Sequence, residues 1–375
     1  MIVRRVLRSS ALLFIVSAGV VGCGDLNSGR AGQVVEGHVT KVLETSIRAS
    51  FGSPDTLVQR LEIAVDSGLF RGELTAVEWR GRGALNDYGL LAAGDQVLLT
   101  ETISGSQRLY AIQEVVRLPA VAPLAALLVL ALAAVGWKQG AASILGLAGS
   151  AVVLFFFVLP SIRGGGDPLV VALLGSAGVL AVSVPGVHGM NRKSLAALGG
   201  TLAGLAIVGV LSAIAVRTAH MTGLASEEAI LVSVGGVVRI DTGRLVLAGL
   251  VVASLGALVD MGVGQASATF ELAAAHDGLR GRTLYASALR VGRDHIGSLV
   301  NTLVFAFFGG ALPLIVLLSF GYLPLSSALN NEQIVGAILQ AVIASIGLVL
   351  CVPVTTAIAV ALASRQAAGL RTEID

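Results

Sequence analysis

Residues Gly292–Phe305 read GRDHIGSLVNTLVF, and this stretch passes without a break from charged residues into a hydrophobic span. Asn301 and Thr302 lie inside the span, with Arg293 and Asp294 about two helical turns before them. A transmembrane helix that carries amides and charges into lipid needs a place where these groups avoid the hydrocarbon. The stretch therefore predicts a membrane helix with a functional site beside it.

The whole chain has the composition of a multi-pass membrane protein. Of its 375 residues, 55% are hydrophobic and 13% are charged, which is about half the charged share of soluble domains. The apolar residues gather in runs long enough to cross the hydrocarbon core as helices. The net charge of +2, without a basic tail, predicts no nucleic-acid partner. The lipid bilayer is the expected environment.

We expect seven membrane-spanning helices, and an eighth if the N-terminal segment is retained. The seven are Ala120–Gly136, Ala141–Leu159, Pro168–Val187, Ser194–Val216, Leu245–Gly264, Leu299–Gly321 and Ile334–Ala363. The last is long enough to tilt, or to kink at Pro353. Residues 218–243 leave two alternatives, an interfacial helix and an additional span. The short apolar stripe, which ends at Arg239 and Asp241, favours the interfacial helix.

Two spans carry small residues at a spacing of four, which predicts faces for close helix packing. These residues are Ala196, Gly200 and Gly204 in one span, and Gly249, Ala253 and Ala257 in another.

The N-terminus has the layout of a bacterial secretory signal. Three arginines precede an apolar run at residues 11–22, and Cys23 follows the run. Val20–Cys23 partly resembles a lipobox, in which the cysteine is lipidated, although leucine is the usual first residue. Two interpretations of residues 1–23 stay open, a signal peptide with lipidation at Cys23 and an uncleaved signal anchor. Both place residue 24 onward outside the cytoplasm.

Residues 24–118 differ from the rest of the chain because they contain no apolar run of span length. Leu61, Ile63 and Val65 alternate with polar residues and so share one face of a strand. The other strand-like runs are Val34–Leu43, Phe70–Trp79, Gln96–Glu101 and Leu109–Val116. Turn residues separate the runs. The predicted fold is thus a polytopic α-helical membrane protein with a small extracytoplasmic β-barrel-like domain of OB or SH3-like kind.

Basic residues in the short loops predict the orientation of the bundle. The cytoplasmic side is expected to hold Trp137–Gln139, His188–Lys193, Glu271–Ser298 and the tail 365–375. Arg163 and the arginines of the 217–244 loop are exceptions, which this orientation places outside. We therefore expect a bacterial inner-membrane protein with a transmembrane domain at 119–364 and a cytoplasmic C-terminus.

Several spans bring polar residues to a similar depth near the predicted cytoplasmic side. The candidate site comprises Asp260, Gln265, Arg293, Asp294, Asn301 and Thr302. An unpaired aspartate costs about 2.5–3.5 kcal/mol at mid-membrane, so Asp260 is expected to point inward toward a partner. Arg293 is the first expected partner and Asn301 the second. The functional interpretation is a site for a solute, ion or proton, and the structural alternative is an Asp–Arg clamp between two helices.

Other polar residues of the spans have simpler explanations. Thr355 and Thr356 are expected to bond to their own helix backbone. His188 and His295 are expected at the membrane interface, without metal-ligand neighbours at useful spacing. The sequence therefore predicts no metal and no cofactor.

The charged motif and the span that precedes it resemble the YibE/F-like family of bacterial membrane proteins. The residues that carry the resemblance are Gly292-Arg293-Asp294, Gly297, Asn301-Thr302-Leu303 and Asp260, together with the Gly94-Asp95 turn. One departure is Ala306-Phe307, where relatives tend to have Ala-Tyr, so this chain lacks a hydroxyl there. The resemblance covers most of the chain and implies its architecture. It implies no substrate, because the family has no established activity.

Two functional hypotheses follow from these patterns. The first is a permease-like carrier of a small solute or ion, energised by a gradient. Because no phosphate-binding Gly-x-x-x-x-Gly-Lys-Ser/Thr motif is present, any drive comes from a gradient or from a partner ATPase. The second is a non-transporting scaffold or sensor whose outer β domain binds a ligand or partner. Self-association or a partner membrane protein fits either hypothesis. We do not expect an enzyme, because the common hydrolase and intramembrane protease motifs are absent.

Overall fold

The computed structural model describes residues 33–50, 53–80, 89–104, 107–235, 240–276, 278–321 and 324–372. The chain divides into two compact units, of which one ends at Ala131 and the other begins at Leu132. The predicted signal segment with Cys23 lies outside the described residues.

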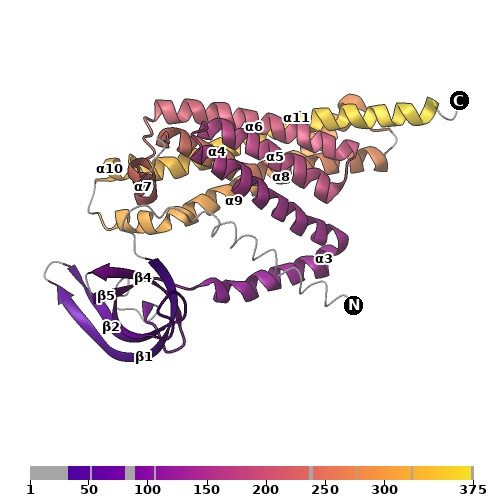
Figure 1. Cartoon of the computed structure of the whole chain (residues 1–375). Coiled ribbons are helices and arrows are strands. Elements are labelled where there is room, and N and C mark those ends of the chain that lie inside the picture. The colour runs from indigo at the N-terminus through magenta and orange to yellow at the C-terminus, as the bar shows by residue number, and fades with distance from the viewer. Residues whose placement is uncertain are drawn as a thin grey trace, which may run out of the picture. The chain divides into compact units, whose positions relative to one another are not determined.

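The first unit contains a five-stranded antiparallel sheet. Its strands are β1 (Gln33–Ser50), β2 (Ser53–Val65), β3 (Leu74–Arg80), β4 (Gln96–Ser104) and β5 (Gln107–Val115). Their order in the sheet is β3-β2-β1-β4-β5, and the edge strands β3 and β5 approach each other. The sheet therefore curls into a half-open barrel, which confirms the predicted small β-barrel-like domain (Figure 1).

Alternating apolar residues fill the concave side of this sheet. Val39, Leu61 and Ile63 are buried there, together with Val97 and Leu99 of β4. The hairpin of β1 and β2 is longer than the sequence predicted, since pairing continues through Glu44 opposite Arg60. Main-chain hydrogen bonds do not depend on side-chain polarity, so paired strands extend beyond the apolar alternation.

From Leu118 onward, the described residues include seven helices that are long and apolar enough to cross a membrane, which confirms the predicted number of later spans. These are Leu118–Trp137, Gly140–Arg163, Pro168–His188, Arg192–Thr218, Thr242–Ala275, Gly281–Ser319 and Glu332–Ser364. The first two lie in α3 (Leu118–Val153), η2 (Leu154–Val158) and α4 (Leu159–Arg163), with a break at Trp137, whose φ is 48°. The others are α5 (Pro168–His188), α6 (Arg192–Thr218), α8 (Thr242–Ala275), α9 (Gly281–Ser319) and α11 (Glu332–Thr372).

Two short helices lie between the spans. They are α7 (Glu227–Gly235) and α10 (Leu325–Leu329). With nine residues, α7 is too short to cross a bilayer. Within the described part of 218–243, the structure therefore agrees with the favoured alternative, a short helix instead of an additional span.

Helix α8 is the centre of the bundle, because α5, α6, α9 and α11 all pack against it. Helices α6 and α11 also lie side by side (Figure 1). Gly200 of α6 lies directly against Thr355, and a Cβ atom on Gly204 would lie 2.9 Å from Leu258 and 3.2 Å from Cys351. These contacts confirm the packing role predicted for the small residues of α6.

Two helices extend well beyond their apolar spans. Helix α8 continues to Ala275 and α9 begins at Gly281, so residues 276–280 alone connect them. The charged start of the 292–305 motif is therefore helical. We call the end of the bundle where α5 and α8 begin the Asp241 end, and the opposite end, where α6 begins, the Lys193 end.

Candidate functional site

Gln265 is the polar centre of the bundle near the Lys193 end. Its side chain is 2% exposed, and its amide nitrogen donates to the carbonyl of Ala288 at 2.9 Å and to the Thr356 hydroxyl at 2.7 Å. The Thr356 hydroxyl in turn donates to the carbonyl of Val352 at 2.7 Å, as predicted. One amide thus joins α8 to α9 and α11, and a buried amide is stable only with such partners.

Gly292, the first residue of the charged motif, allows this close approach. A Cβ atom at position 292 would lie 2.5 Å from the amide oxygen of Gln265 and 2.7 Å from a methyl carbon of Val352. Any side chain at this position would require Gln265, Val352 or α9 to shift. The glycine of the motif therefore has a packing role, while the charges that follow it lie elsewhere on the helix.

The other residues of the candidate site are exposed in this chain. They are Asp260 on α8, and Arg293, Asp294, Asn301 and Thr302 on α9. Ile296, Leu299 and Leu303 form the stripe of α9 that packs on α8 and α11. The Thr302 hydroxyl donates to its own helix, at the carbonyl of Ser298, at 3.0 Å.

Asp260 does not pair with either of the partners that the sequence predicted. His295 is the group whose electrostatic effect reaches the Asp260 carboxylate. Within the described ranges, no ion pair or hydrogen bond joins Asp260 to Arg293 or Asn301. At about 100° per residue, Arg293 lies about 200° around α9 from His295, and Asn301 is also turned away. The expected Asp260–Arg293 pair is therefore not formed.

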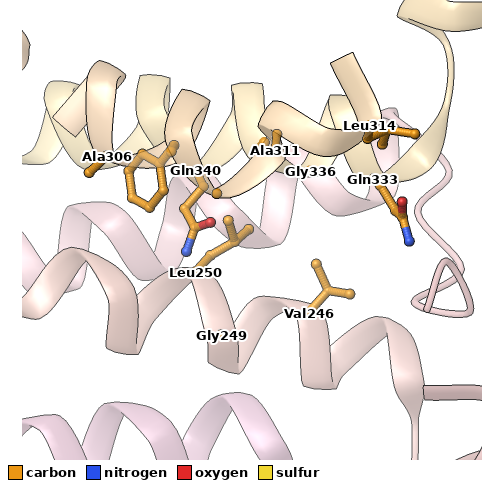
Figure 2. A pocket seen from close by; sticks show the side chains of 12 residues that line it. Val246, Gly249, Leu250, Ala306, Ala311, Leu314, Gln333, Gly336 and Gln340 are labelled. Carbon is orange, nitrogen blue, oxygen red and sulfur yellow. The ribbon is translucent and has the colours of Figure 1, made fainter. Parts of the chain in front are cut away.

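A cavity of about 520 Å³ lies between α8, α9 and α11, closer to the Asp241 end. Its wall is mainly apolar, and Gln333 and Gln340 of α11 supply its polar groups. The Gln340 side chain projects toward α8 beside Leu250, as Figure 2 shows. Gln333 donates to the carbonyl of Ala225 at 2.6 Å, whereas Gln340 has no hydrogen-bond partner in the part of the chain that the structure describes. The cavity thus offers one amide to a ligand.

The cavity and Asp260 belong to the same face of α8. Val246 and Gly249 line the cavity, and Ala253, Asp260 and Gly264 follow at spacings of four, seven and four, which keep one helical face.

Helix α9 repeats the arrangement with Ala306 at the cavity, then Thr302 and His295 at spacings of four and seven. On each helix, one face therefore runs from the cavity, to Asp260 on α8 and to His295 on α9.

The sequence analysis did not predict the cavity, although one of the small residues that line it was noticed. Gly249 was assigned to helix packing, yet a Cβ atom there would meet nothing within 4 Å. The same holds for Gly310 on the opposite wall. Small residues on a helix face allow either close packing or an open space, and sequence spacing does not separate the two. The packing prediction is therefore wrong for Gly249.

No group of three or more His, Cys, Asp or Glu side chains that could hold a metal ion occurs among the described residues. Cys351 is buried and lies 3.4 Å from both the Thr355 hydroxyl and the Gly200 carbonyl. It fills space between α6 and α11.

Comparison with known protein families shows the family to which this chain is related. A family model described as YibE/F-like protein matches residues 124–365, well over half of the chain. The chain belongs to the YibE/F-like family. The match covers nearly all of the helical part of this YibE/F-like protein, including α8, α9 and the cavity. Comparisons with curated proteins and with solved structures find no match.

Proposed function

We propose that this YibE/F-like protein is a gradient-driven, permease-like carrier of a small solute or ion in the bacterial inner membrane. The observation that carries the proposal is the continuous face of α8, which lines the cavity at Gly249 and carries Asp260 three turns further on. A solute site and an ionisable group on one helix face are the two parts that a coupled carrier needs.

The chemistry of the cavity favours a small solute that is largely apolar or uncharged. Its lining includes no charged side chain, and the Gln340 amide offers both donors and an acceptor. Ligand sites in proteins commonly combine an apolar wall with a few polar groups that orient the ligand.

Asp260 is the proposed coupling group. A carboxylate within a span is costly unless a partner, water or a bound cation compensates it, and such residues mark ion or proton pathways. His295 supplies a neighbour that can carry a proton. Thr302 lies on the same face of α9, and Arg293, Asp294 and Asn301 on its other faces would shape the approach from the Lys193 end, which we assign to the cytoplasm.

Cysteine accessibility tests the proposal without knowledge of the solute. Gly249→Cys and Gly264→Cys place thiols at the cavity and one turn beyond Asp260, where both residues are exposed. A thiol reacts as its thiolate, which requires water. We expect a membrane-impermeant maleimide to label Gly249→Cys from the periplasm and Gly264→Cys from the cytoplasm. Gly309→Cys, a nearby exposed position that does not line the cavity, serves as the lipid-protected control.

Resistance of both Gly249→Cys and Gly264→Cys to labelling from either side, with full labelling after denaturation, would contradict the carrier proposal. That result would favour the alternative, a non-transporting scaffold or sensor. Asp260→Asn and Asn301→Leu provide a second test in cells. At normal membrane abundance, both variants are expected to reproduce the phenotype of a gene deletion, and wild-type behaviour in both would count against the site.

A further inference from the structure

A second cavity, of about 690 Å³, lies at the Asp241 end between the start of α5, the end of α6 and the start of α8. Five polar residues line it, namely Arg217, His220, Thr222, Asp241 and Arg244. The remaining lining is largely apolar. Arg217 and Arg244 belong to the 217–244 loop, whose arginines are exceptions to the predicted distribution of basic residues. The orientation of the bundle therefore does not explain why these two arginines are present.

The positive charge of Arg244 is not available to a ligand of the cavity, because two carboxylates compensate it. It forms an ion pair with Asp167, and its Nε atom lies 3.7 Å from an oxygen of Asp241. Asp167 also caps α5 by accepting from the amide of Leu169 at 3.0 Å, and Asp241 caps α8 by accepting from the amide of Arg244 at 3.0 Å. These charges compensate one another and fix the starts of the two helices.

Arg217 is different, because it has no ion pair or hydrogen bond within the described residues. It lines the cavity near the end of α6 together with Ala213 and Val216, and with His220, which follows the helix. An unpaired guanidinium beside an apolar wall presents a planar set of donors that matches an oxyanion.

His220 lies beside Arg217 in an unusual backbone conformation. Its φ is 50°, a left-handed value that costs a non-glycine residue about 1–2 kcal/mol. The position ends α6, since the amide of Met221 donates back to the carbonyl of Val216 at 3.0 Å, an arrangement in which glycine is usual. Histidine at position 220 therefore has a strained backbone conformation, and its imidazole ring joins the Arg217 guanidinium in the cavity lining.

The segment after His220 is held in place from two other helices. Glu332 of α11 accepts from the Thr222 hydroxyl at 2.7 Å and from the amide of Gly223 at 2.6 Å. The Thr242 hydroxyl of α8 donates to the carbonyl of Thr222 at 2.8 Å. The Glu332 carboxylate is thus paired with these donors. The backbone that follows His220 is held by α8 and α11, which keeps His220 beside Arg217 in the absence of a ligand.

We propose that this second cavity binds a phosphate-type oxyanion, with Arg217 as the charged ligand and His220 as the second donor. The oxyanion belongs either to a free phosphate or to the headgroup of an anionic lipid, whose chain the apolar wall at Leu169, Met221 and Leu247 would accommodate. The proposal does not depend on transport, since it concerns a different cavity from the one between α8, α9 and α11.

Binding measurements on the purified full-length protein test the proposal. Inorganic phosphate, titrated against chloride at constant ionic strength, is expected to raise the thermal unfolding midpoint and to show a Kd by calorimetry. Arg217→Gln should weaken this Kd by about tenfold or more, as for the loss of a charged hydrogen bond. Arg282→Gln removes the same charge from an exposed position at the Lys193 end and should leave the Kd unchanged.

A lipid arm separates the two sources of the oxyanion. Nanodiscs of phosphatidylcholine with and without phosphatidylglycerol are compared, and a stabilisation by phosphatidylglycerol that Arg217→Gln loses would assign the cavity to a lipid headgroup. Stabilisation by phosphate alone would assign it to a free anion. If neither ligand distinguishes Arg217→Gln from wild type more than it distinguishes Arg282→Gln, the proposal is wrong.

His220→Gly isolates the role of the ring. This variant is expected to raise the unfolding midpoint without ligand, because glycine adopts the left-handed conformation at no cost, and to weaken oxyanion binding. Unchanged affinity for the bound oxyanion in His220→Gly would overturn the assignment of the second donor.

Discussion

The side-chain amide of Gln265 lies directly against the backbone of Gly292, where α8 crosses α9. The amide oxygen would be 2.5 Å from a Cβ atom at position 292, while the amide nitrogen bonds to α9 and α11. Close packing and hydrogen bonding thus coincide at this contact, and the arrangement of three helices depends on a glycine and a glutamine that lie against each other.

Gly292→Ala is expected to destabilise the bundle. The added methyl group would press on Gln265 and Val352, and overpacking of this kind costs about 1–3 kcal/mol. Gly297→Ala, one and a half turns later in the same helix, adds its methyl group in open space and should be neutral or slightly stabilising. Thermal unfolding in detergent compares the two variants, and equal midpoints would contradict the role of Gly292.

Gln265→Leu and Thr356→Val should show energetic coupling. Each removes one partner of the 2.7 Å bond, and leucine at 265 also leaves the Ala288 carbonyl without its side-chain donor. Single losses of about 1–3 kcal/mol and a coupling of about 0.5–3 kcal/mol are expected. The measurement is a double-mutant cycle of unfolding free energies. Strict additivity would show that the bond contributes nothing to stability.

Gly310→Leu is expected to fill the cavity between α8, α9 and α11 without harm to the fold. Both Gly310 and its neighbour Gly309 have no atom within 4 Å of an added Cβ, but Gly310 alone of the two lines the cavity. Gly310→Leu should therefore slow maleimide labelling of Gly249→Cys, whereas Gly309→Leu should not. Membrane abundance of both variants is measured first, and equal labelling rates would contradict the proposed solute path.

Glu332→Ala should loosen the segment that follows α6. The carboxylate accepts from Thr222 and Gly223, and loss of a hydrogen bond to a charged group costs about 1.5–3 kcal/mol. The unfolding midpoint is expected to fall. Glu271→Ala removes an exposed carboxylate that has no hydrogen-bond partner among the described residues, and it should leave the midpoint unchanged.

The β domain should lose stability at high pH through Tyr110. Burial, followed by the negative charges of Glu101 and Glu73, raises the pKa of Tyr110 above its ordinary value of 10.0. The folded protein then holds the phenol proton more tightly than the unfolded chain. The stabilisation is complete below the unfolded pKa and is lost as pH rises through the folded pKa.

Difference absorbance between wild type and Tyr110→Phe reports this titration. The phenol is expected to ionise above pH 10, and the fall in stability above that pH should be shallower in Tyr110→Phe. A phenolate that forms at or below its ordinary pKa would contradict the assigned environment.

Sequence patterns identified the long helices and most strands of this protein, but not all of their boundaries. Apolar runs identify the seven spans because a backbone in hydrocarbon must bond within its own helix, whatever its neighbours are. Alternation at Leu61, Ile63 and Val65 identifies a strand because one face of the sheet is buried. The lengths of α8 and α9 were underestimated, since helices continue past the membrane with polar residues that hydropathy does not register.

The candidate site was predicted in part. Gln265 is a central residue, but as a buried link between helices, and Asp260 does not form the predicted ion pair with Arg293. Gly292 was part of the 292–305 motif, but nothing in the sequence indicates that Gly292 contacts Gln265. The cavity at Gln340 and Gly310 was missed, because the sequence does not distinguish small residues that allow close packing from small residues that line an open space.

By itself, the sequence determined that this chain is a multi-pass membrane protein with a small β domain, because hydrophobic length and alternation act along a single segment. Tertiary structure alone decided which residues meet. Helical periodicity relates positions around one axis, but the rotation of α9 against α8 is set by the fit of Gly292 to Gln265 and by the apolar stripe of Ile296, Leu299 and Leu303. That rotation places the apolar stripe of α9 against its neighbours and leaves Arg293 without an ion pair to Asp260.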